Sequence, residues 1–389
     1  MFNPQQIVKF KKRVTPFYYY NMELLEVTLD TIVKEAGKYG YKIHYALKAN
    51  TDDKILTRIR KVGFGADCVS GNEVQKALEI GFPAEEIFFA GVGKTDKEIQ
   101  LGLNRNIGCF NCESAQELEV IANMSRGRKR KTPVALRINP DIDSQTHSYI
   151  TTGRTENKFG FPMQVLNEII PALQSYSDID LIGLHFHIGS QITNMDVFKK
   201  LCSRVNEIEK WFYEQGFRLP VINLGGGLGI DYNKPVANPI PRFAEFFKTI
   251  HDNLLQRPSQ EVHFELGRSV VGQMGTLISK VLYIKRGVDK NFAILDSGMT
   301  ELIRPALYHS YHMIQNLSGI TEKVAGKFEN YEVVGPICET SDFLGKEIVL
   351  PVTERGDIIA IRSAGAYGQS MASNYNLREK AGVAYSTDL

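Results

Sequence analysis

Residues 42–50 read K-I-H-Y-A-L-K-A-N, a short β-rich apolar run that ends in a lysine. A helical stretch precedes this run, and four of its apolar residues recur at helical spacing: Leu25, Leu29, Ile32 and Ala36. This spacing gives the predicted helix one apolar face, as expected of a helix that packs against a sheet. The same unit of apolar run, turn and amphipathic helix repeats to about residue 275.

The repeated units predict alternating strands and helices. The predicted strands are K-I-H-Y-A-L (42–47), G-F-G-A-D (63–67), I-F-F-A-G (87–91), I-G-C-F-N (107–111), P-V-A-L-R-I (133–138), L-I-G-L-H-F-H (181–187), P-V-I-N-L (220–224) and E-V-H-F-E (261–265). Helical candidates between them include 71–81, 95–105, 114–124, 196–215 and 242–257. Eight such units are typical of a (β/α)₈ barrel, with an open doubly wound sheet as the weaker alternative.

The helical pattern fades after residue 275, and β-rich runs follow one another. They include T-L-I-S-K-V-L-Y-I-K, F-A-I-L-D, Y-E-V-V-G, E-I-V-L-P-V and D-I-I-A-I-R. This succession predicts a separate all-β domain. The extended stretch from Thr15 to Tyr20 is placed to pair with its sheet. We therefore expect a barrel over residues 21–275 and a β-domain made of residues 1–20 and 276–389.

Composition excludes several classes of protein. The chain has 389 residues, 43% of them hydrophobic, and a net charge of +2, so no overall field attracts nucleic acid or an anionic membrane. No secretory signal or membrane span is recognisable. Five scattered cysteines indicate reduced thiols and a cytoplasmic location. Cys109 and Cys112 form a lone C-x-x-C without further ligands, so we expect thiols there and no metal site.

Reactive side chains fall at the carboxyl ends of the predicted strands, which is where barrels of this class carry their active sites. These residues are Lys48, Asp67, Arg137, His185, His187, the turn from Gly225 to Gly227, Glu265 and Arg268. A lysine alone at a strand end usually faces solvent. A desolvated lysine with a lowered pKa is, however, what Schiff-base chemistry requires.

Three further features are compatible with a bound cofactor. The glycine turn after the seventh strand fits a phosphate, although a simple tight turn explains it equally well; Ser190 could supply a hydroxyl to the same anion. Glu265 fits the carboxylate that protein sites place against the nitrogen of a pyridine ring, or it forms an ion pair with Arg268. His187 could stack on such a ring, yet His185-x-His187 is also a metal-binding pattern. A metal-dependent hydrolase barrel is therefore a rival reading.

Ten ordered motifs resemble the fold-type III pyridoxal phosphate-dependent decarboxylases, most closely the members that act on diaminopimelate. They are Y-A-L-K-A-N (45–50), G-A-D-C-V-S-G (65–71), R-I-N-P-D (137–141), E-N-K-F-G (156–160), H-F-H-I-G-S-Q (185–191), N-L-G-G-G-L-G-I (223–230), E-L-G-R (265–268), I-R-P-A-L-Y (303–308), G-P-I-C-E (335–339) and S-A-G-A-Y-G (363–368). Together they cover nearly the whole chain.

The resemblance implies a role for each residue at the cofactor. Lys48 would form a Schiff base with pyridoxal phosphate, His187 would stack on the ring, and Glu265 would hold the pyridine nitrogen. The other expected cofactor neighbours are Asp67, Ser190, Gly225, Gly226, Gly227, Leu266, Gly267, Arg268 and Tyr367. The family usually has proline where this chain has Leu266, and leucine keeps a backbone N–H that proline lacks.

The resemblance also implies a substrate, meso-diaminopimelate, with L-lysine and carbon dioxide as products. Its distal end would meet Arg268, Arg304, Tyr308, Glu339 and Tyr367. Arginine forks suit the distal carboxylate and a carboxylate suits the distal ammonium. Glu339 is informative because ornithine-type relatives carry aspartate there and lack the arginine pair. The alternative is the same chemistry on ornithine, arginine or a carboxylated polyamine.

Family members place a cysteine and an acidic residue of one subunit into the barrel of the other. By resemblance these residues are Cys338 and Glu339, so we expect a homodimer with shared active sites. Cys338 is the candidate proton donor to the α-carbon, with Lys48 as the second candidate. Some relatives are regulatory binding proteins without cofactor chemistry. The presence of Lys48, Glu265 and Cys338 argues against that reading.

Overall fold

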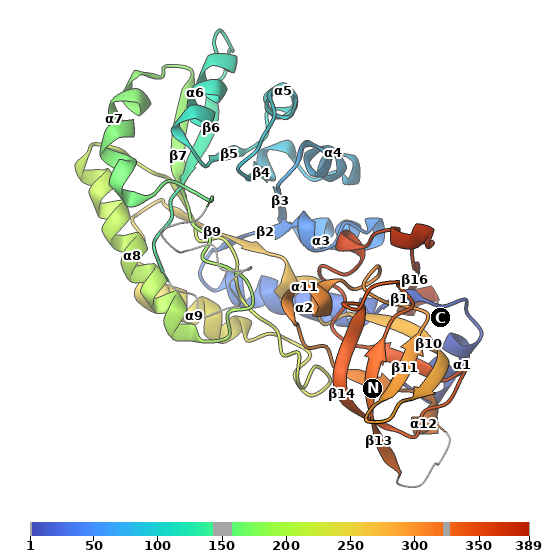
Figure 1. Cartoon of the computed structure of the whole chain (residues 1–389). Coiled ribbons are helices and arrows are strands. Elements are labelled where there is room, and N and C mark those ends of the chain that lie inside the picture. The colour runs from blue at the N-terminus through green and yellow to red at the C-terminus, as the bar shows by residue number, and fades with distance from the viewer. Residues whose placement is uncertain (1, 143–157, 322–326, 389) are drawn as a thin grey trace. The chain divides into compact units, whose positions relative to one another are not determined.

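The computed structural model of the chain describes residues 2–142, 158–321 and 327–388 (Figure 1). By backbone contacts the chain divides into two compact units. The barrel unit comprises Leu29–Gly229 and Arg242–Gly267, and the β unit comprises Met1–Thr28, Ile230–Pro241 and Arg268–Leu389. The first two residues of the E-N-K-F-G motif lie outside the described residues.

The barrel unit contains a closed barrel of parallel strands, which confirms the predicted fold class and all eight predicted strands. The strands are β2 (Lys42–Ala46), β3 (Gly65–Cys68), β4 (Ile87–Phe89), β5 (Cys109–Cys112), β6 (Thr132–Arg137), β7 (Ile179–His185), β8 (Val221–Asn223) and β9 (Glu261–Leu266). Closure comes from β2 and β9, which pair in parallel with His44 opposite Glu265. This pairing brings residues more than 200 positions apart in the chain to neighbouring strand ends.

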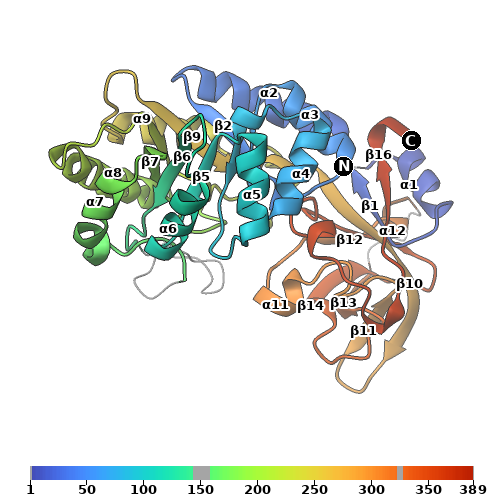
Figure 2. The ribbon, with the colours of Figure 1, turned by 90° about the horizontal axis from the view of Figure 1, so that it is seen from above.

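Helices lie outside the strands of this barrel (Figure 2). They are α3 (Asp53–Lys61), α4 (Gly71–Ile80), α5 (Asp96–Arg105), α6 (Ala115–Met124), α7 (Leu166–Ser175), α8 (Met195–Glu214) and α9 (Phe243–Asn253), with α2 (Met22–Gly37) leading into the first strand. Local sequence explains where several of them begin, because a side-chain oxygen caps the first free backbone N–H groups. Such caps are Asp52, Ser70, Thr95 and Ser114.

Helix α9 shows how the apolar face of a helix packs against the barrel. Phe246 and Phe247 are buried, and their ring centroids lie 5.4 and 5.2 Å from that of Phe264 on strand β9. Both contacts are edge-to-face, the arrangement that aromatic rings prefer. Strand β9 is thereby held on its outer face, while Glu265, the next residue, has the opposite orientation that alternation along a strand requires.

The β unit contains an eight-stranded sheet, which confirms the predicted β-domain architecture. Its strands are β1 (Phe17–Tyr20), β10 (Gly275–Arg286), β11 (Asn291–Leu295), β12 (Ile314–Asn316), β13 (Phe328–Val334), β14 (Phe343–Pro351), β15 (Ile358–Ile361) and β16 (Gly382–Tyr385). As predicted, the N-terminal strand joins this sheet, because β1 pairs with both β10 and β16. The short strands β12 and β16 were not predicted. Its helices are α1 (Pro4–Lys11), α10 (Arg268–Val271), α11 (Arg304–Tyr308) and α12 (Ser318–Thr321).

The division by contacts places residues 21–28, 230–241 and 268–275 with the β unit, although the predicted barrel of residues 21–275 included them. The domain boundaries at residues 20 and 275 therefore stay a prediction. Within the ranges that the structure describes, no helix is long and apolar enough to cross a membrane.

Removal of the Phe247 ring tests the packing of α9 on the barrel. Phe247 is fully buried, so Phe247→Ala is expected to lower the free energy of unfolding by about 3 to 5 kcal/mol. Urea denaturation followed by far-UV circular dichroism measures this change. Leu255→Ala, which truncates a side chain that is 75% exposed just after α9, is the control. Equal stability of the two variants would contradict the packing role.

Candidate active site

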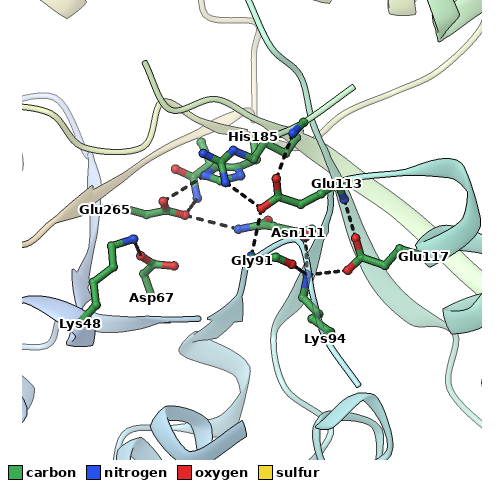
Figure 3. A network of polar contacts seen from close by, with 12 residues as sticks. Lys48, Asp67, Gly91, Lys94, Asn111, Glu113, Glu117, His185 and Glu265 are labelled. Carbon is green, nitrogen blue, oxygen red and sulfur yellow. Dashed lines mark hydrogen bonds and ion pairs between the residues drawn. The ribbon is translucent and has the colours of Figure 1, made fainter. Parts of the chain in front are cut away.

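Glu265 is a buried carboxylate near the carboxyl end of β9 that receives three side-chain hydrogen bonds. His185 lies 3.0 Å from Oε2, and the amide nitrogens of Asn223 and Asn111 lie 2.8 and 3.4 Å from Oε1. These donors come from the ends of three other strands, β7, β8 and β5. Figure 3 shows His185 and Asn111 directed at the carboxylate. An ionised carboxylate accepts only, so His185 donates through Nε2.

The neighbours of Glu265 keep its side chain ionised. Burial acts to raise the pKa of this carboxyl, but the charge and hydrogen bond of His185, together with the charge of Lys48, hold the pKa well below its usual value. The sequence offered an ion pair with Arg268 as an alternative role. In the structure, Glu265 accepts hydrogen bonds from His185, Asn111 and Asn223. A buried carboxylate of this kind can hold a proton on a basic nitrogen placed against it.

Lys48 and Asp67 form an ion pair beside this carboxylate. Lys48 lies in a short 3₁₀ turn, Leu47–Ala49, directly after β2, and its Nζ is 3.4 Å from Oδ2 of Asp67. Figure 3 shows the two side chains pointing toward one another. Burial and the negative charge of Glu265 raise the pKa of Asp67 to about 7, although Lys48 acts to lower it. Oδ1 of Asp67 is buried without a hydrogen-bond partner among the described residues.

His187 follows β7, and its ring is neutral, whereas the Glu265 carboxylate is ionised. The Gly226 N–H donates a hydrogen bond to its Nδ1 at 3.2 Å, so the proton of the neutral ring is on Nε2. Burial and the charges of Lys48 and Arg137 hold the pKa of His187 well below its usual value. A neutral ring with Nδ1 occupied is suited to stacking on a flat ligand. No cluster of three or more metal-ligating side chains occurs in the part of the chain described here.

The glycine turn after β8 admits no side chain at its first positions. Gly225 has a φ of +66°, and a Cβ there would lie 2.2 Å from the carbonyl oxygen of Phe186. At Gly226 it would lie 2.1 Å from the carbonyl oxygen of Glu265. The amides of these two residues bond to Asn223 and His187.

The next two amides of this turn remain available to a ligand. The N–H groups of Gly227 and Leu228 have no acceptor among the described residues. Gly227 has a φ of +111°, which favours glycine. The loop that carries Ser190 lies against it, since the Ile192 N–H donates to the Gly227 carbonyl oxygen at 2.8 Å. Free amides beside a hydroxyl in a glycine turn form a cradle for an anion.

A second buried network occupies the ends of β4, β5 and β6 (Figure 3). Glu113 binds Arg137 at 2.7 Å and accepts from the Gly91 and Gly160 amides, both at 3.0 Å. Lys94 binds Glu117 at 2.6 Å and donates to the carbonyl oxygens of Gly91 and Asn111. This network ties three loops together next to the strand that presents Asn111.

Sequence reasoning missed the amides of Asn111 and Asn223. Each is an uncharged polar residue inside an apolar strand, and each is fully buried. That pattern was a usable signal, because a buried side-chain amide requires hydrogen-bond partners. Lys94, Glu113 and Glu117 were also missed, since they lie in loops and first helical turns where charged residues are common.

Further residues predicted for the site lie in the β unit. Arg268 and Arg304 are buried, and both donate to the hydroxyl of Tyr232, at 2.7 and 2.8 Å. The Arg268 guanidinium lies 4.9 Å from the ring centroid of Tyr367, a residue with a φ of +57°. Tyr308 ends helix α11. Arg304 and Arg268 thus share one hydroxyl, a contact that the sequence did not indicate.

Cys338 and Glu339 lie on an exposed loop of the β unit. The Cys338 N–H donates to Oδ1 of Asn376 at 3.1 Å, and the Tyr375 hydroxyl donates to Glu339 at 2.7 Å. The structure therefore holds the two residues at the surface of their own unit. Leu266 and Gly267 close the barrel unit, where Leu266 is the buried last residue of β9.

The barrel residues fit pyridoxal phosphate. Lys48 supplies an amine, Glu265 an ionised carboxylate for a pyridine nitrogen, and His187 a neutral ring. The free amides of the glycine turn and the unpartnered Oδ1 of Asp67 offer polar contacts that the described residues do not use.

Comparison with known proteins decides the family. Residues 26–272 match the family model described as pyridoxal-dependent decarboxylase, pyridoxal binding domain. A diaminopimelate decarboxylase of Bacteroides thetaiotaomicron is 54% identical over 374 residues, which cover 96% of each chain. This chain belongs to the diaminopimelate decarboxylase family of pyridoxal-dependent enzymes.

Comparison with solved structures agrees with this family assignment. The diaminopimelate decarboxylase from Helicobacter pylori, in complex with L-lysine, superimposes with a TM-score of 0.90 at 36% identity, over 98% of this chain and 94% of that one. The arginine decarboxylase of Paramecium bursaria Chlorella virus shares the fold with a TM-score of 0.86 at 20% identity, over 98% of both chains. The metal-dependent hydrolase reading is thereby superseded.

The raised pKa of Asp67 predicts a pH-dependent effect in the cofactor-free decarboxylase. Because the pKa is raised on folding, the protonated form favours the folded state. The contribution of the Asp67 side chain to the free energy of unfolding is fully present below about pH 4. It is lost as the pH rises through about 7. Asp67→Asn mimics the protonated form, so its stability relative to wild type should increase between these two pH values and then level off.

Thermal unfolding of cofactor-free wild type and Asp67→Asn across this pH range measures the difference. Asp30→Asn, which removes an exposed carboxylate on α2, controls for the change in net charge. A difference that stays constant, or that shrinks as the pH rises, would show that burial of Asp67 does not shift its pKa as described.

Proposed function

We propose that this chain removes one carboxylate from meso-diaminopimelate, with pyridoxal phosphate on Lys48, and releases L-lysine and carbon dioxide. The observation that carries this proposal is the buried Glu265 carboxylate, held ionised beside Lys48 by donors from three strands. Bound pyridoxal phosphate supplies the electron sink for the negative charge that remains on the α-carbon when carbon dioxide leaves. Glu265 serves that chemistry by holding a proton at the pyridine nitrogen.

Lys48 and Asp67 exchange protons in the proposed reaction. The amine of Lys48 must be neutral to attack a carbonyl carbon and must be released when the substrate amine takes its place. Asp67, with its pKa raised to about 7, can exchange a proton with Lys48 across 3.4 Å. His187 provides a neutral face for the ring, and Ser190 with the glycine turn holds the phosphate. Leu266 at the end of β9, together with Gly267, Arg268 and Tyr367, completes the cofactor site.

The residues of the β unit recognise the far end of the substrate. Arg268 and Arg304 are buried guanidinium groups that can bind a carboxylate through two parallel hydrogen bonds. Glu339 carries the negative charge that an ammonium group needs, and Tyr308 and Tyr367 contribute hydroxyl groups. A substrate with an amino-acid group at its far end satisfies both charges. Ornithine and arginine present no carboxylate there, so they offer Arg268 and Arg304 no anion to bind.

We further propose that the enzyme is a homodimer with shared active sites. Cys338 and Glu339 are exposed on a loop that Asn376 and Tyr375 fix by hydrogen bonds. In the dimer this loop reaches the barrel mouth of the partner chain, where the Cys338 thiol donates a proton to the α-carbon. The free thiols of the described chain are in keeping with the cytoplasm, the location we propose.

Removal of the Lys48 amine tests the cofactor anchor. Lys48→Ala is expected to lose the visible absorbance of the lysine-bound cofactor and to lower turnover of meso-diaminopimelate by at least about a hundredfold. Carbon dioxide release and an absorbance spectrum measure both effects. Lys42→Ala, at the exposed start of the same strand, is the matched control and should retain both properties. Full turnover by Lys48→Ala would refute the proposed mechanism.

Hybrid dimers test whether the sites are shared. Lys48→Ala and Cys338→Ala, each with its own affinity tag, should be nearly inactive alone. When mixed so that subunits exchange, half of the dimers are hybrids and each has one intact shared site, so activity should recover to about a quarter of wild type.

Hybrids isolated through both tags remove any doubt about exchange. Activity in these purified hybrids supports a site that combines Lys48 of one chain with Cys338 of the other. Purified hybrids that are no more active than the parent variants would contradict the shared site, because each chain would then use its own cysteine.

A further inference from the structure

Arg304 is a buried cation whose partners among the described residues are all neutral. Its side chain belongs to a residue that is 3% exposed, and it donates to the Tyr232 hydroxyl at 2.8 Å, to Nε2 of His312 at 2.9 Å and to the Ser310 hydroxyl at 3.3 Å. Its Nε is buried and has no partner among the described residues. A buried charge without a counter-ion is costly, so this arrangement is suited to an anion supplied from outside.

His312 positions Arg304 without neutralising it. Its Nδ1 lies 2.8 Å from the carbonyl oxygen of Arg362, which can only accept, so Nδ1 carries the proton and Nε2 accepts from Arg304. Burial and the charge of Arg304 lower the pKa of His312 to about 3. The ring therefore stays neutral at physiological pH, and the guanidinium keeps its charge.

Tyr232 is held in place by both arginines and by His312. Its hydroxyl accepts from Arg268 at 2.7 Å and from Arg304 at 2.8 Å, and its ring meets that of His312 edge-on, with centroids 5.1 Å apart. A phenol hydroxyl has two acceptor lone pairs and one proton to donate. The two arginines occupy the lone pairs, and the proton has no acceptor among the described residues.

We propose that Tyr232 is a specificity-determining residue, which fixes Arg268 and Arg304 and donates its hydroxyl proton to the carboxylate at the far end of the substrate. His312 acts as a positioning residue for Arg304 and Tyr232. This inference rests on the proposed function, because it assigns a third donor to the same carboxylate. Three neighbouring donors distinguish a substrate with a distal carboxylate from a simple diamine.

Inhibition by two ligands separates recognition from structural support. L-lysine carries the distal carboxylate, whereas 1,5-diaminopentane has the same chain without it. In the holoenzyme, Tyr232→Phe should raise the KM for meso-diaminopimelate and the inhibition constant of L-lysine by roughly 10- to 100-fold, as expected for one hydrogen bond to a charged group. The inhibition constant of 1,5-diaminopentane should stay within about twofold of wild type.

Two further variants make the comparison decisive. Tyr283→Phe removes the hydroxyl of a tyrosine that is 55% exposed on β10, and it should leave all three constants unchanged. His312→Phe retains a ring against Tyr232 but removes the acceptor for Arg304. Like Tyr232→Phe, it should raise the inhibition constant of L-lysine and leave that of 1,5-diaminopentane unchanged. An unchanged visible absorbance of the lysine-bound cofactor shows that each variant is folded.

Each outcome discriminates between the possibilities. If Tyr232→Phe raised the inhibition constants of both ligands equally, Tyr232 would have only a structural role. If the inhibition constant of L-lysine did not change, Tyr232 would have no part in recognition. Either result overturns this inference. Failure of the wild-type enzyme to decarboxylate meso-diaminopimelate would instead overturn the proposed function. Weaker binding that is confined to ligands with the distal carboxylate supports both this inference and the proposed function.

Discussion

The burial of one negative charge, on Glu265, is the constraint on which the site depends. A carboxylate inside a barrel is tolerated only when hydrogen bonds and opposite charges replace the lost water. His185, Asn223 and Asn111 supply those hydrogen bonds from three different strands. The closed barrel brings these strand ends to one point, so the fold and the protonation state of the site are linked.

The charge on Glu265 also organises the groups around it. Its negative charge helps to raise the pKa of Asp67 to about 7, so this carboxyl titrates near neutral pH. His187, by contrast, is kept neutral by burial and by nearby cations. Three titratable groups at the ends of different barrel strands thus differ in charge: Glu265 is held ionised, the pKa of Asp67 is raised to about 7, and the His187 ring is kept neutral. In the β unit, the described hydrogen-bond partners of the buried Arg304 cation are the neutral Tyr232, His312 and Ser310.

The sequence was sufficient to predict the barrel because each strand is an apolar run followed by a turn and an amphipathic helix. It also placed Lys48 and Glu265 at the carboxyl ends of barrel strands, where the structure has them, while their roles at a cofactor stay a prediction. It did not predict Asn111 or Tyr232. Their roles depend on partners 154 and 36 residues away, and such contacts exist only after the strands pair and the loops pack.

The most direct measurement of the central claim is borohydride reduction of the enzyme with pyridoxal phosphate, followed by mass spectrometry of its peptides. Reduction makes a cofactor–lysine bond permanent, so the account predicts the added mass on the peptide that contains Lys48. Prior addition of meso-diaminopimelate should prevent this modification, because the substrate amine takes the place of the lysine. Modification of another lysine, or equal modification of Lys48 with and without substrate, would contradict the account.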